Sequence, residues 1–225
     1  SDEIQRISST VNGNKSTITV VYGRRRVGKS ALVRQALQGK RAYYFEGLEN
    51  QSKANQIQNF LSQLHFQAQD DQPPQPQRFW RDAFKLLLPF CGNQEVVIVL
   101  DEFQWMANYR SEIVSDLKMV WDQYLSQSGK VHLILCGSIA SFMIKKVIAS
   151  KALYGRVDTE IHPQPFSLSE TKAMLKPRST EEIMTAQMLV GGIPKYLDLI
   201  SPESSVHVAL QKQAFTPQGY FVKEH

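Results

Sequence analysis

The 225-residue sequence has few cysteines and no long apolar run. Its two cysteines, Cys91 and Cys136, lie far apart, and no C-x-x-C pair or cysteine–histidine cluster accompanies them. We therefore expect neither a disulfide scaffold nor a structural zinc site. The most hydrophobic run, 96–100, is only as long as a strand, whereas a membrane helix needs about 18 or more apolar residues. The sequence thus predicts no contact with a membrane.

A signal-peptide pattern and a large excess of charge are also missing. The N-terminus has no basic stretch followed by an apolar one, so we expect a cytoplasmic protein. The 26 lysines and arginines against 21 acidic residues give a net charge of +5 and a pI near 9.1. This mild charge is compatible with nucleotides, with nucleic acid or with no anionic partner. The hydrophobic fraction of 42% excludes a disordered or fibrous chain. Glutamines are frequent but scattered, and we assign them no role.

Strand-like and helical patterns alternate over the first two thirds of the chain. The strand-like runs, which are rich in β-branched residues, are 17–22, 42–45, 95–100, 131–135 and 159–162. Helical patterns separate them at 29–37, 52–66, 79–90, 111–126 and 139–149. Such alternation predicts an α/β fold with a mostly parallel sheet.

Beyond Phe166 the strand-like runs stop. The remaining patterns are helical, at 167–175, 181–189, 194–200 and 204–215. Ser179 and Glu182, three residues apart, resemble a capping box. We therefore predict an α/β core over residues 1–165 and a small helical subdomain over residues 166–225.

A phosphate-binding loop is predicted directly after the first strand. Residues 23–30, GRRRVGKS, match G-x-x-x-x-G-K-S/T between a strand and a helix. Glycine lets the backbone N–H groups turn inward around an anion, and the start of the helix directs its positive end to the same place. Lys29 would contact the β- and γ-phosphates, and the Ser30 hydroxyl would bind Mg²⁺.

The loop defines the candidate nucleotide-binding residues. The three arginines inside it add positive charge near a polyphosphate, and the simpler alternative is a charged surface without a catalytic role. The predicted nucleotide-binding residues are Gly23, Arg24, Arg25, Arg26, Val27, Gly28, Lys29, Ser30 and Ala31.

Two carboxylates follow the most hydrophobic strand. Asp101 and Glu102 come directly after 95–100, and ligands bind at the carboxyl ends of strands in open α/β sheets. Asp101 is predicted to hold Mg²⁺, and Glu102 to orient or deprotonate the attacking water. An exposed acidic turn is the alternative. The presence of Glu102 favours nucleotide hydrolysis over phosphoryl transfer to a metabolite.

Two further polar residues are candidates for the catalytic site. Ser138 ends the next strand, where it would contact the γ-phosphate or the water, or else cap the following helix. Arg156 could stabilise the charge of the transition state, although a lone arginine is more commonly a solvated surface charge. The predicted catalytic residues are Lys29, Glu102, Ser138 and Arg156.

Taken together, these motifs resemble a known group of proteins. YGRRRVGKS at 22–30, LDEFQW at 100–105, GS at 137–138, LYGR at 153–156 and GGIP at 191–194 occur in that order. This pattern is similar to the archaeal and bacterial P-loop ATPases of the AAA+-like and STAND branches. The resemblance implies ATP as the nucleotide, a sheet in the order 5-1-4-3-2 and a C-terminal helical lid. It also implies that Pro194 contacts the adenine and that Arg156 senses the γ-phosphate.

Two features depart from the family pattern. The segment that usually recognises the base before the first strand is reduced to residues 2–4. Family members often continue into a winged-helix and nuclease-like region that this sequence lacks, so we expect a piece of a longer protein. DNA contact through such outside regions, and self-association, stay open.

The leading hypothesis is an Mg²⁺-dependent ATPase that acts as a nucleotide-dependent switch and binds ATP and ADP. GTP is disfavoured because no N-K-x-D segment is present. One alternative is a P-loop kinase for a small acceptor. Another is a nucleic-acid-binding regulator without significant turnover, suggested by the pI and by Lys145 and Lys146, although no standard nucleic-acid motif supports it.

Overall fold

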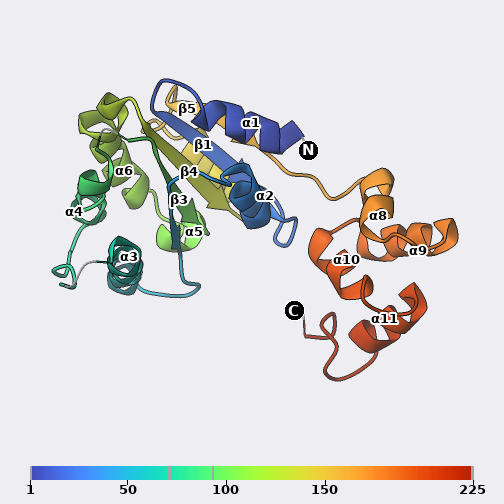
Figure 1. Cartoon of the computed structure of the whole chain (residues 1–225). Helices are drawn as coiled ribbons and strands as arrows, with labels where there is room; N and C mark the ends of the chain where they lie inside the picture. The colour runs from blue at the N-terminus through green and yellow to red at the C-terminus, as the bar shows by residue number, and fades with distance from the viewer. Residues whose placement is uncertain (1, 70–71, 93, 224–225) are drawn as a thin grey trace. The chain divides into compact units, whose positions relative to one another are not determined.

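The computed structural model describes residues 2–69, 72–92 and 94–223, and the chain forms two compact units (Figure 1). The first unit contains the described residues up to Pro163 except 26–28. The second contains residues 26–28 and those from Gln164 onward. Residues 1 and 224–225 of the predicted subdomains lie outside the described part of the chain.

Within the described residues, the first unit is built on five parallel strands. They are β1 (Thr17–Tyr22), β2 (Ala42–Glu46), β3 (Val96–Asp101), β4 (Val131–Gly137) and β5 (Val157–Ile161). Their order across the sheet is β2-β3-β4-β1-β5, and each neighbouring pair is parallel. Counted from the β5 edge this is 5-1-4-3-2, so the predicted α/β class and strand order are confirmed.

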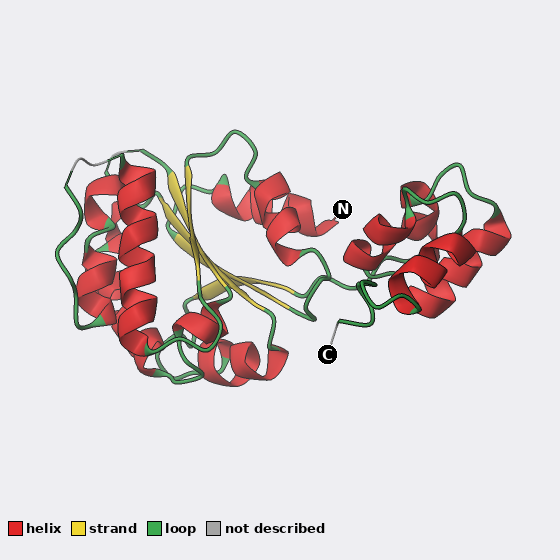
Figure 2. Cartoon of the chain, turned by 90° about the horizontal axis from the view of Figure 1, so that it is seen from below, coloured by secondary structure: helices red, strands yellow, loops and turns green. Residues whose placement is uncertain are grey.

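Helices cover both faces of the sheet (Figure 2). One face packs against α3 (Lys53–Ala68), α4 (Trp80–Lys85) and α6 (Glu112–Gln123). The other packs against α1 (Asp2–Val11) and α2 (Lys29–Ala36). Alternate strand residues serve the two layers: Ile98 and Leu100 point to the first, Val97 and Val99 to the second. This double burial explains why the central strands are continuously apolar.

Helix α1 was not predicted from the sequence. The family resemblance identifies residues 2–4 only as a shortened base-recognition segment. Ile7 and Val11 are fully buried in the layer formed with α2, and they lie one helical turn apart on the same face. Their spacing was the available signal for a helix.

Several predicted helices are shorter than expected. The pattern at 79–90 forms α4 and a separate 3-10 turn, η1 (Leu88–Phe90), where Pro89 interrupts the hydrogen bonding. Short α5 (Phe103–Met106) follows β3, and the 3-10 turn η2 (Leu125–Ser128) follows α6. The pattern at 139–149 forms α7 (Ala140–Phe142) and then the π-helix η3 (Met143–Ile148).

The edge strand β2 is closed by side-chain amides from α3. Gln67 accepts a hydrogen bond from Tyr44 N at 2.8 Å and donates to Tyr44 O at 2.7 Å. Gln63 makes the same pair of bonds with Glu46, at 2.8 and 3.0 Å. Gln56 bonds both backbone groups of Leu48. These amides take the place of a neighbouring strand, so the backbone of the edge is paired and protected from aggregation.

The second unit is helical. Its elements are α8 (Leu168–Met174), α9 (Thr180–Val190), α10 (Pro194–Ile200) and α11 (Val206–Ala214). The helices bury a small aliphatic core of Leu175, Ile183, Ala186, Val190, Leu197, Ile200, Val206 and Ala209.

The predicted capping box is only half correct. Ser179 does cap α9 by accepting a hydrogen bond from Glu182 N. The Glu182 carboxylate, however, accepts from Val206 N at 3.0 Å and from Arg178 at 3.1 Å. The complete box is formed by Ser167 and Glu170 at the start of α8.

Among the described residues, no helix combines the length and the hydrophobicity that crossing a bilayer requires.

Candidate nucleotide-binding site

Three strand ends meet at one edge of the sheet. The loop 23–30 follows β1, Asp101 ends β3, and Gly137 ends β4, which lies between these two strands. Gly23 N donates a hydrogen bond to Gly137 O at 3.3 Å, so the loop starts against the end of β4. The topology therefore brings the two ends of the loop, 23–25 and 29–30, together with the acidic pair and Ser138 in the first unit.

Lys29 is held inside the loop. Its ammonium group donates to Gly23 O at 2.9 Å and to Arg24 O at 3.0 Å, and the residue is only 6% exposed. Burial lowers the pKa of Lys29 from its ordinary value of 10.5, while the charges of Glu102 and Asp101 act in the opposite direction. Gly28 has a φ of +90°, a conformation that the absence of a Cβ permits. The loop is thus a curved backbone with one cation directed along its inside.

Ser30 and Asp101 supply oxygen atoms at the start of α2. The Ser30 hydroxyl donates to Asp101 Oδ2 at 2.6 Å, although the two residues are 71 positions apart. A hydroxyl and a carboxylate side by side are the hard oxygen ligands that Mg²⁺ prefers. No group of three or more His, Cys, Asp or Glu residues that could hold a metal occurs in the described chain. Mg²⁺ is usually bound by one or two protein groups together with substrate phosphates, and the Ser30–Asp101 pair is a site of that kind.

Glu102 adopts an unusual backbone conformation. Its φ of 48° and ψ of 46° lie in the left-handed region, which is uncommon for a residue with a side chain. Glu102 N donates to Asp101 Oδ1 at 2.9 Å, and Ser138 Oγ donates to Glu102 Oε2 at 2.7 Å. The turn therefore directs the carboxylate toward the end of β4. Local strain of this kind is concentrated at functional sites.

Gln104 completes the network and was missed by the sequence reasoning. It is fully buried, and its amide group donates to Glu102 Oε2 and to Ser138 Oγ, the latter at 3.0 Å. Its carbonyl oxygen accepts from Ser138 N at 3.2 Å. Gln104 therefore fixes two predicted catalytic residues against each other. The available signal was a polar residue two positions after Glu102 in an otherwise apolar short helix.

Ser138 is not a helix cap, because the N-cap of α7 is Ile139. The space beside it is tight: a Cβ on Gly137 would lie 2.4 Å from Met143 Sδ and 2.9 Å from Gln104 Oε1. Glycine is therefore required at 137 for Gln104 and the π-helix to approach the end of β4.

A third carboxylate, Glu46, ends β2 opposite Asp101 and was also not predicted as a site residue. Burial and the charges of Asp101 and Glu102 raise the pKa of Glu46 from its ordinary value of 4.5. The raised pKa means that the neighbouring carboxylates disfavour the ionised form of Glu46, and a cation bound beside them would relieve this repulsion.

The three arginines of the loop have different environments. Arg24 and Arg25 are exposed and Arg26 is partly buried with a φ of 71°. Arg25 lies over the Trp105 ring at 5.3 Å and within 3.8 Å of Glu49. Of the remaining predicted binding residues, Val27 is buried and Ala31 is exposed.

Arg156 is placed away from the loop, contrary to its predicted role. It directly precedes β5, at the amino end of the parallel sheet, whereas the loop follows the carboxyl end of β1. Its guanidinium donates to both oxygens of Asp122, at 2.7 and 2.8 Å. Within this chain, Arg156 is thus a partner of α6 and not of the phosphate loop.

Pro194, the predicted adenine contact, belongs to the second unit. It occupies the first turn of α10, where proline is favoured because its missing N–H would have no helical partner.

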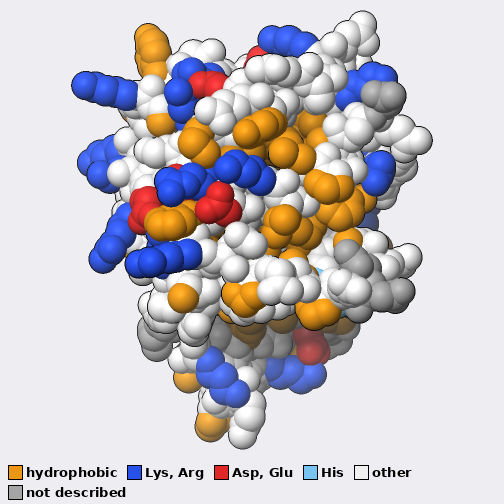
Figure 3. Space-filling view, turned by 90° about the vertical axis from the view of Figure 1, so that its left-hand side faces the viewer, with side chains coloured by type: hydrophobic (Ala, Val, Ile, Leu, Met, Phe, Trp, Pro, Cys, Tyr) orange, Lys and Arg blue, Asp and Glu red, His pale blue; other side chains and the backbone are white. Residues whose placement is uncertain are grey.

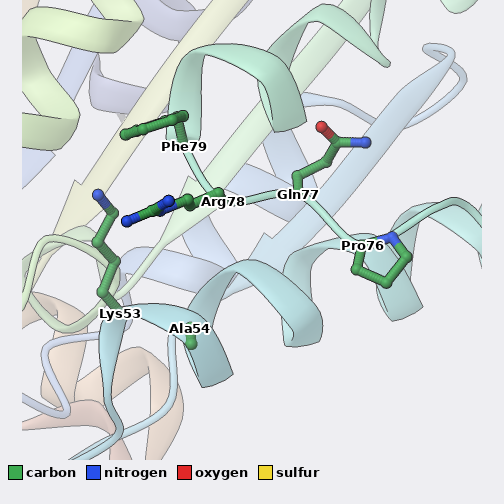
Figure 4. A pocket seen from close by; sticks show the side chains of 6 residues that line it. All are labelled: Lys53, Ala54, Pro76, Gln77, Arg78 and Phe79. Carbon is green, nitrogen blue, oxygen red and sulfur yellow. The ribbon is translucent and has the colours of Figure 1, made fainter.

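A separate pocket of about 580 Å³ lies on the first unit, lined by Lys53, Ala54, Pro76, Gln77, Arg78 and Phe79 (Figure 4). Lys53 and Arg78 point toward each other there. The lining contains no carboxylate or hydroxyl, and Lys53 is paired with Glu112. Because its lining has no carboxylate or hydroxyl, the pocket adds no metal ligand to the site at the strand ends.

The side of the molecule that carries α3 and α4 has mixed charge: acidic side chains lie among lysines and arginines there (Figure 3).

This chain is similar to known proteins in sequence and in fold. Residues 1–200 match the model of an ATPase domain predominantly from Archaea. An uncharacterised protein of Methanocaldococcus jannaschii is 24% identical over 203 residues, which cover 88% of this chain and 43% of that protein. This chain therefore spans less than half the length of that relative.

Two solved structures show the same fold. The Walker-type ATPase of Pyrococcus abyssi has a TM-score of 0.67 at 20% identity, and the match covers 93% of this chain and 69% of that one. The ORC2 protein of Aeropyrum pernix, solved as ADPNP–ADP complexes, has a TM-score of 0.57 at 18% identity, with 91% of this chain and 56% of that one covered.

Proposed function

This chain belongs to the family of ATPase domains found predominantly in Archaea, and we propose from that premise that it binds Mg-ATP and hydrolyses the β–γ phosphoanhydride. The observation that carries the proposal is that Lys29 and Ser30, at the start of α2, and Asp101, at the end of β3, meet at the loop 23–30. These are the cation, hydroxyl and carboxylate that a triphosphate with a divalent metal requires.

The loop and its lysine bind the substrate. The inward-facing amides and the start of α2 receive the phosphate oxygens, and Lys29 exchanges its two carbonyl contacts for the β- and γ-phosphates. Ser30 and Asp101 hold Mg²⁺, which neutralises charge on the phosphates when bound. The exposed arginines of the loop add attraction for the polyphosphate.

Glu102 activates the water. The hydrogen bonds from Ser138 and Gln104 fix its Oε2 and leave Oε1 to accept a proton from a water beside the γ-phosphate. Ser138 also contacts that water or the γ-phosphate. Glu46 stands opposite Asp101 on the neighbouring strand, beside the proposed metal site, and is not assigned the role of the base.

The helical unit responds to the nucleotide in this proposal. Pro194 would contact the adenine, so that ATP favours one arrangement of α8–α11 and hydrolysis releases it. Slow ATP turnover would be sufficient for such a switch. The populations of the two arrangements of α8–α11 depend only on how differently ATP binds to each of them.

Two substitutions in the loop and the acidic pair test the activity. Lys29→Ala should weaken ATP binding and lower turnover by about 10²–10³-fold, since one preorganised charge is lost. Glu102→Gln should keep ATP binding and lower turnover by about 10²–10⁴-fold, since the general base is lost. Phosphate release and nucleotide-dependent thermal stability, each with and without Mg²⁺, measure the two effects.

Lys40→Ala is the matched control, because Lys40 pairs with Glu95 away from the loop and carries the same charge. It should leave turnover unchanged. Full turnover by Glu102→Gln would overturn the assignment of the base. ADP formation that requires an added acceptor would instead identify a kinase.

A further inference from the structure

The segment 143–156 has an unusual concentration of positive charge. Its sequence, MIKKVIASKALYGR, holds four basic residues and no acidic one. It comprises the π-helix η3 and the turns that lead to β5, and we call it the basic segment. The proposed ATPase activity uses none of its side chains.

The basic segment has one buried face and one exposed face. Met143, Val147 and Leu153 are fully buried in the layer that contains α3, α4 and α6. The exposed residues between them are Ile144, Lys145, Lys146, Ala149, Lys151, Tyr154 and Gly155. All three lysines therefore lie on the outward side of one anchored element.

Within the described part of the chain, the three exposed lysines of this segment have no acidic partner. Lys145, Lys146 and Lys151 make no ion pair with any described residue. Elsewhere on the same unit, Lys53 pairs with Glu112 and Lys85 with Asp82. Arg156 is not part of the free charge, because it is bound to Asp122. The three lysines thus form a positive surface that only an outside anion can neutralise.

An exposed aromatic ring accompanies these lysines. Tyr154 is 77% exposed, and among the described residues its ring stacks on no other ring or cation. Keeping such a ring in water costs free energy that a flat partner would recover. Lysines beside a free aromatic ring are the combination with which proteins bind single-stranded nucleic acid, because cations bind phosphates and the ring stacks on a base.

We infer that the basic segment is a binding surface for single-stranded nucleic acid, with Lys145, Lys146 and Lys151 on the phosphates and Tyr154 stacked on a base. An anionic membrane fits less well. Beside Tyr154, the exposed face offers only one large apolar side chain, Ile144 at 42% exposure, whereas an interfacial helix needs a continuous apolar face.

The test is binding of a fluorescent 20-nucleotide oligothymidine to the chain without ATP, followed by anisotropy at several salt concentrations. Because no nucleotide is added, the result is independent of the proposed ATPase activity. Three phosphate contacts predict a slope of about −2 for log K against log salt, from about −0.7 per contact on a single strand. The triple variant K145E/K146E/K151E should lose at least about tenfold in affinity and most of the slope.

Two further variants separate stacking from charge. Tyr154→Ala should lower affinity about tenfold, whereas Tyr154→Phe should keep it, because stacking needs only the ring. The triple variant K172E/K176E/K223E carries the same change in charge on exposed lysines of the second unit and should bind like the original chain.

Three outcomes would overturn the inference. They are no binding of the oligonucleotide at 50 mM salt, equal losses in the two triple variants, and equal affinities of Tyr154→Ala and the original chain. Binding to vesicles of phosphatidylcholine with 30% phosphatidylserine, without binding to the oligonucleotide, would identify a membrane surface instead. Far-UV circular dichroism of every variant confirms that η3 and the sheet are intact.

Discussion

The two units of this chain reach a stable structure by different means. The first has a parallel sheet with an apolar layer on each face, and large rings such as Phe60, Trp80 and Phe84 are fully buried. The second has only aliphatic side chains among the described residues of its buried core. Its helix ends are joined instead by polar groups, above all Arg178 and Glu182. The comparison indicates that the first unit has the larger apolar core, whereas the second adds hydrogen bonds at its helix ends to a smaller one.

This difference also explains where the site lies. In the first unit, the buried strands fix the positions of their carboxyl ends, so polar residues such as Asp101 and Ser138 are held without a core of their own. A helical unit with a small core has no comparable rigid edge. It is better suited to movement, because fewer apolar contacts oppose a change in arrangement.

The largest effect on stability is expected from a substitution among the packed rings of Phe45, Phe60, Trp80 and Phe84, which we call the aromatic layer of the first unit. Phe60 lies 4.4 Å from the Phe45 ring and 5.5 Å from the Phe84 ring, measured between centroids. Phe60→Ala should lower the free energy of unfolding of the first unit by about 3–5 kcal/mol, through lost transfer energy and a cavity. Urea unfolding followed by tryptophan fluorescence measures it.

Phe66→Ala is the matched control for this prediction, since Phe66 is on the same helix but 84% exposed. It should change the free energy of unfolding by less than about 0.5 kcal/mol. Similar losses in the two variants would contradict the claim that the aromatic layer holds the first unit.

A smaller loss of stability, confined to the second unit, is expected when Arg178 is replaced. We call Arg178 and its hydrogen-bond partners the charged clamp. The Arg178 side chain is 8% exposed, pairs with Glu182, and donates to the carbonyl oxygens of Ile200, Ser201 and Glu203. Arg178→Met should cost about 2–3 kcal/mol, because a charged hydrogen-bonding group is lost and the partly buried carbonyl oxygens of Ile200 and Glu203 are left without it. Hydrogen exchange should show faster exchange in α9–α11 and unchanged protection of β1, β3 and β4.

Arg78→Met is the control for the clamp, because Arg78 is an exposed arginine that makes no ion pair among the described residues. If Arg178→Met accelerated hydrogen exchange equally in both units, the two units would not be stabilised independently of each other.

Much of the fold could be predicted because its signals are local. The strand at 96–101 is recognisable from its aliphatic run, and the loop at 23–30 from fixed spacing between a strand and a helix. The strand order followed from the family resemblance and not from periodicity. The boundaries of the helices were less accurate, because Pro89 and the tight contact at Gly137 act through hydrogen bonding and packing.

The parts of the site that were missed depend on contacts between distant residues. No pattern places Gln104 against Ser138, since the two meet only when β3 and β4 pair. Arg156 was assigned to the site by resemblance, but the direction of β5 puts it at the other end of the sheet. The glutamines looked scattered because Gln56, Gln63 and Gln67 share a purpose only on a helix beside the edge of β2.

Within the site, Gln104 is expected to act as a positioning residue. Gln104→Leu removes the hydrogen bonds that the Gln104 amide donates to Glu102 and to Ser138, and it leaves the direct Ser138–Glu102 bond in place. It should lower the turnover number about tenfold, equivalent to about 1.4 kcal/mol. The KM for ATP should stay within about twofold, since Gln104 does not line the phosphate loop. Steady-state phosphate release separates the two parameters.

The control is Gln77→Leu, the same change in the pocket away from the strand ends. It should leave both parameters unchanged. A large rise in KM with unchanged turnover after Gln104→Leu would contradict the positioning role.

The smallest effect is expected at the opposite end of the sheet, where Arg156 holds Asp122. Hydrogen bonding from the guanidinium lowers the pKa of Asp122 below its ordinary value of 3.8. A lowered folded-state pKa stabilises the protein above the unfolded value, and this contribution is lost as pH falls through the folded value. Because both side chains are about 30% exposed, Asp122→Asn should cost only about 0.5–1 kcal/mol at pH 7.

Unfolding measured as a function of pH tests this prediction most directly. The difference in unfolding free energy between Asp122→Asn and the original chain should persist from pH 7 to pH 5 and shrink below pH 4, as the carboxylate is protonated. Asp82→Asn, which alters an exposed pair with Lys85 one helical turn away, should show a smaller difference at pH 7. Turnover at pH 7 should be the same in all three chains, because the Arg156–Asp122 pair stands apart from the phosphate loop. If Asp122→Asn lowered the turnover number, Arg156 would again have to be considered a catalytic residue.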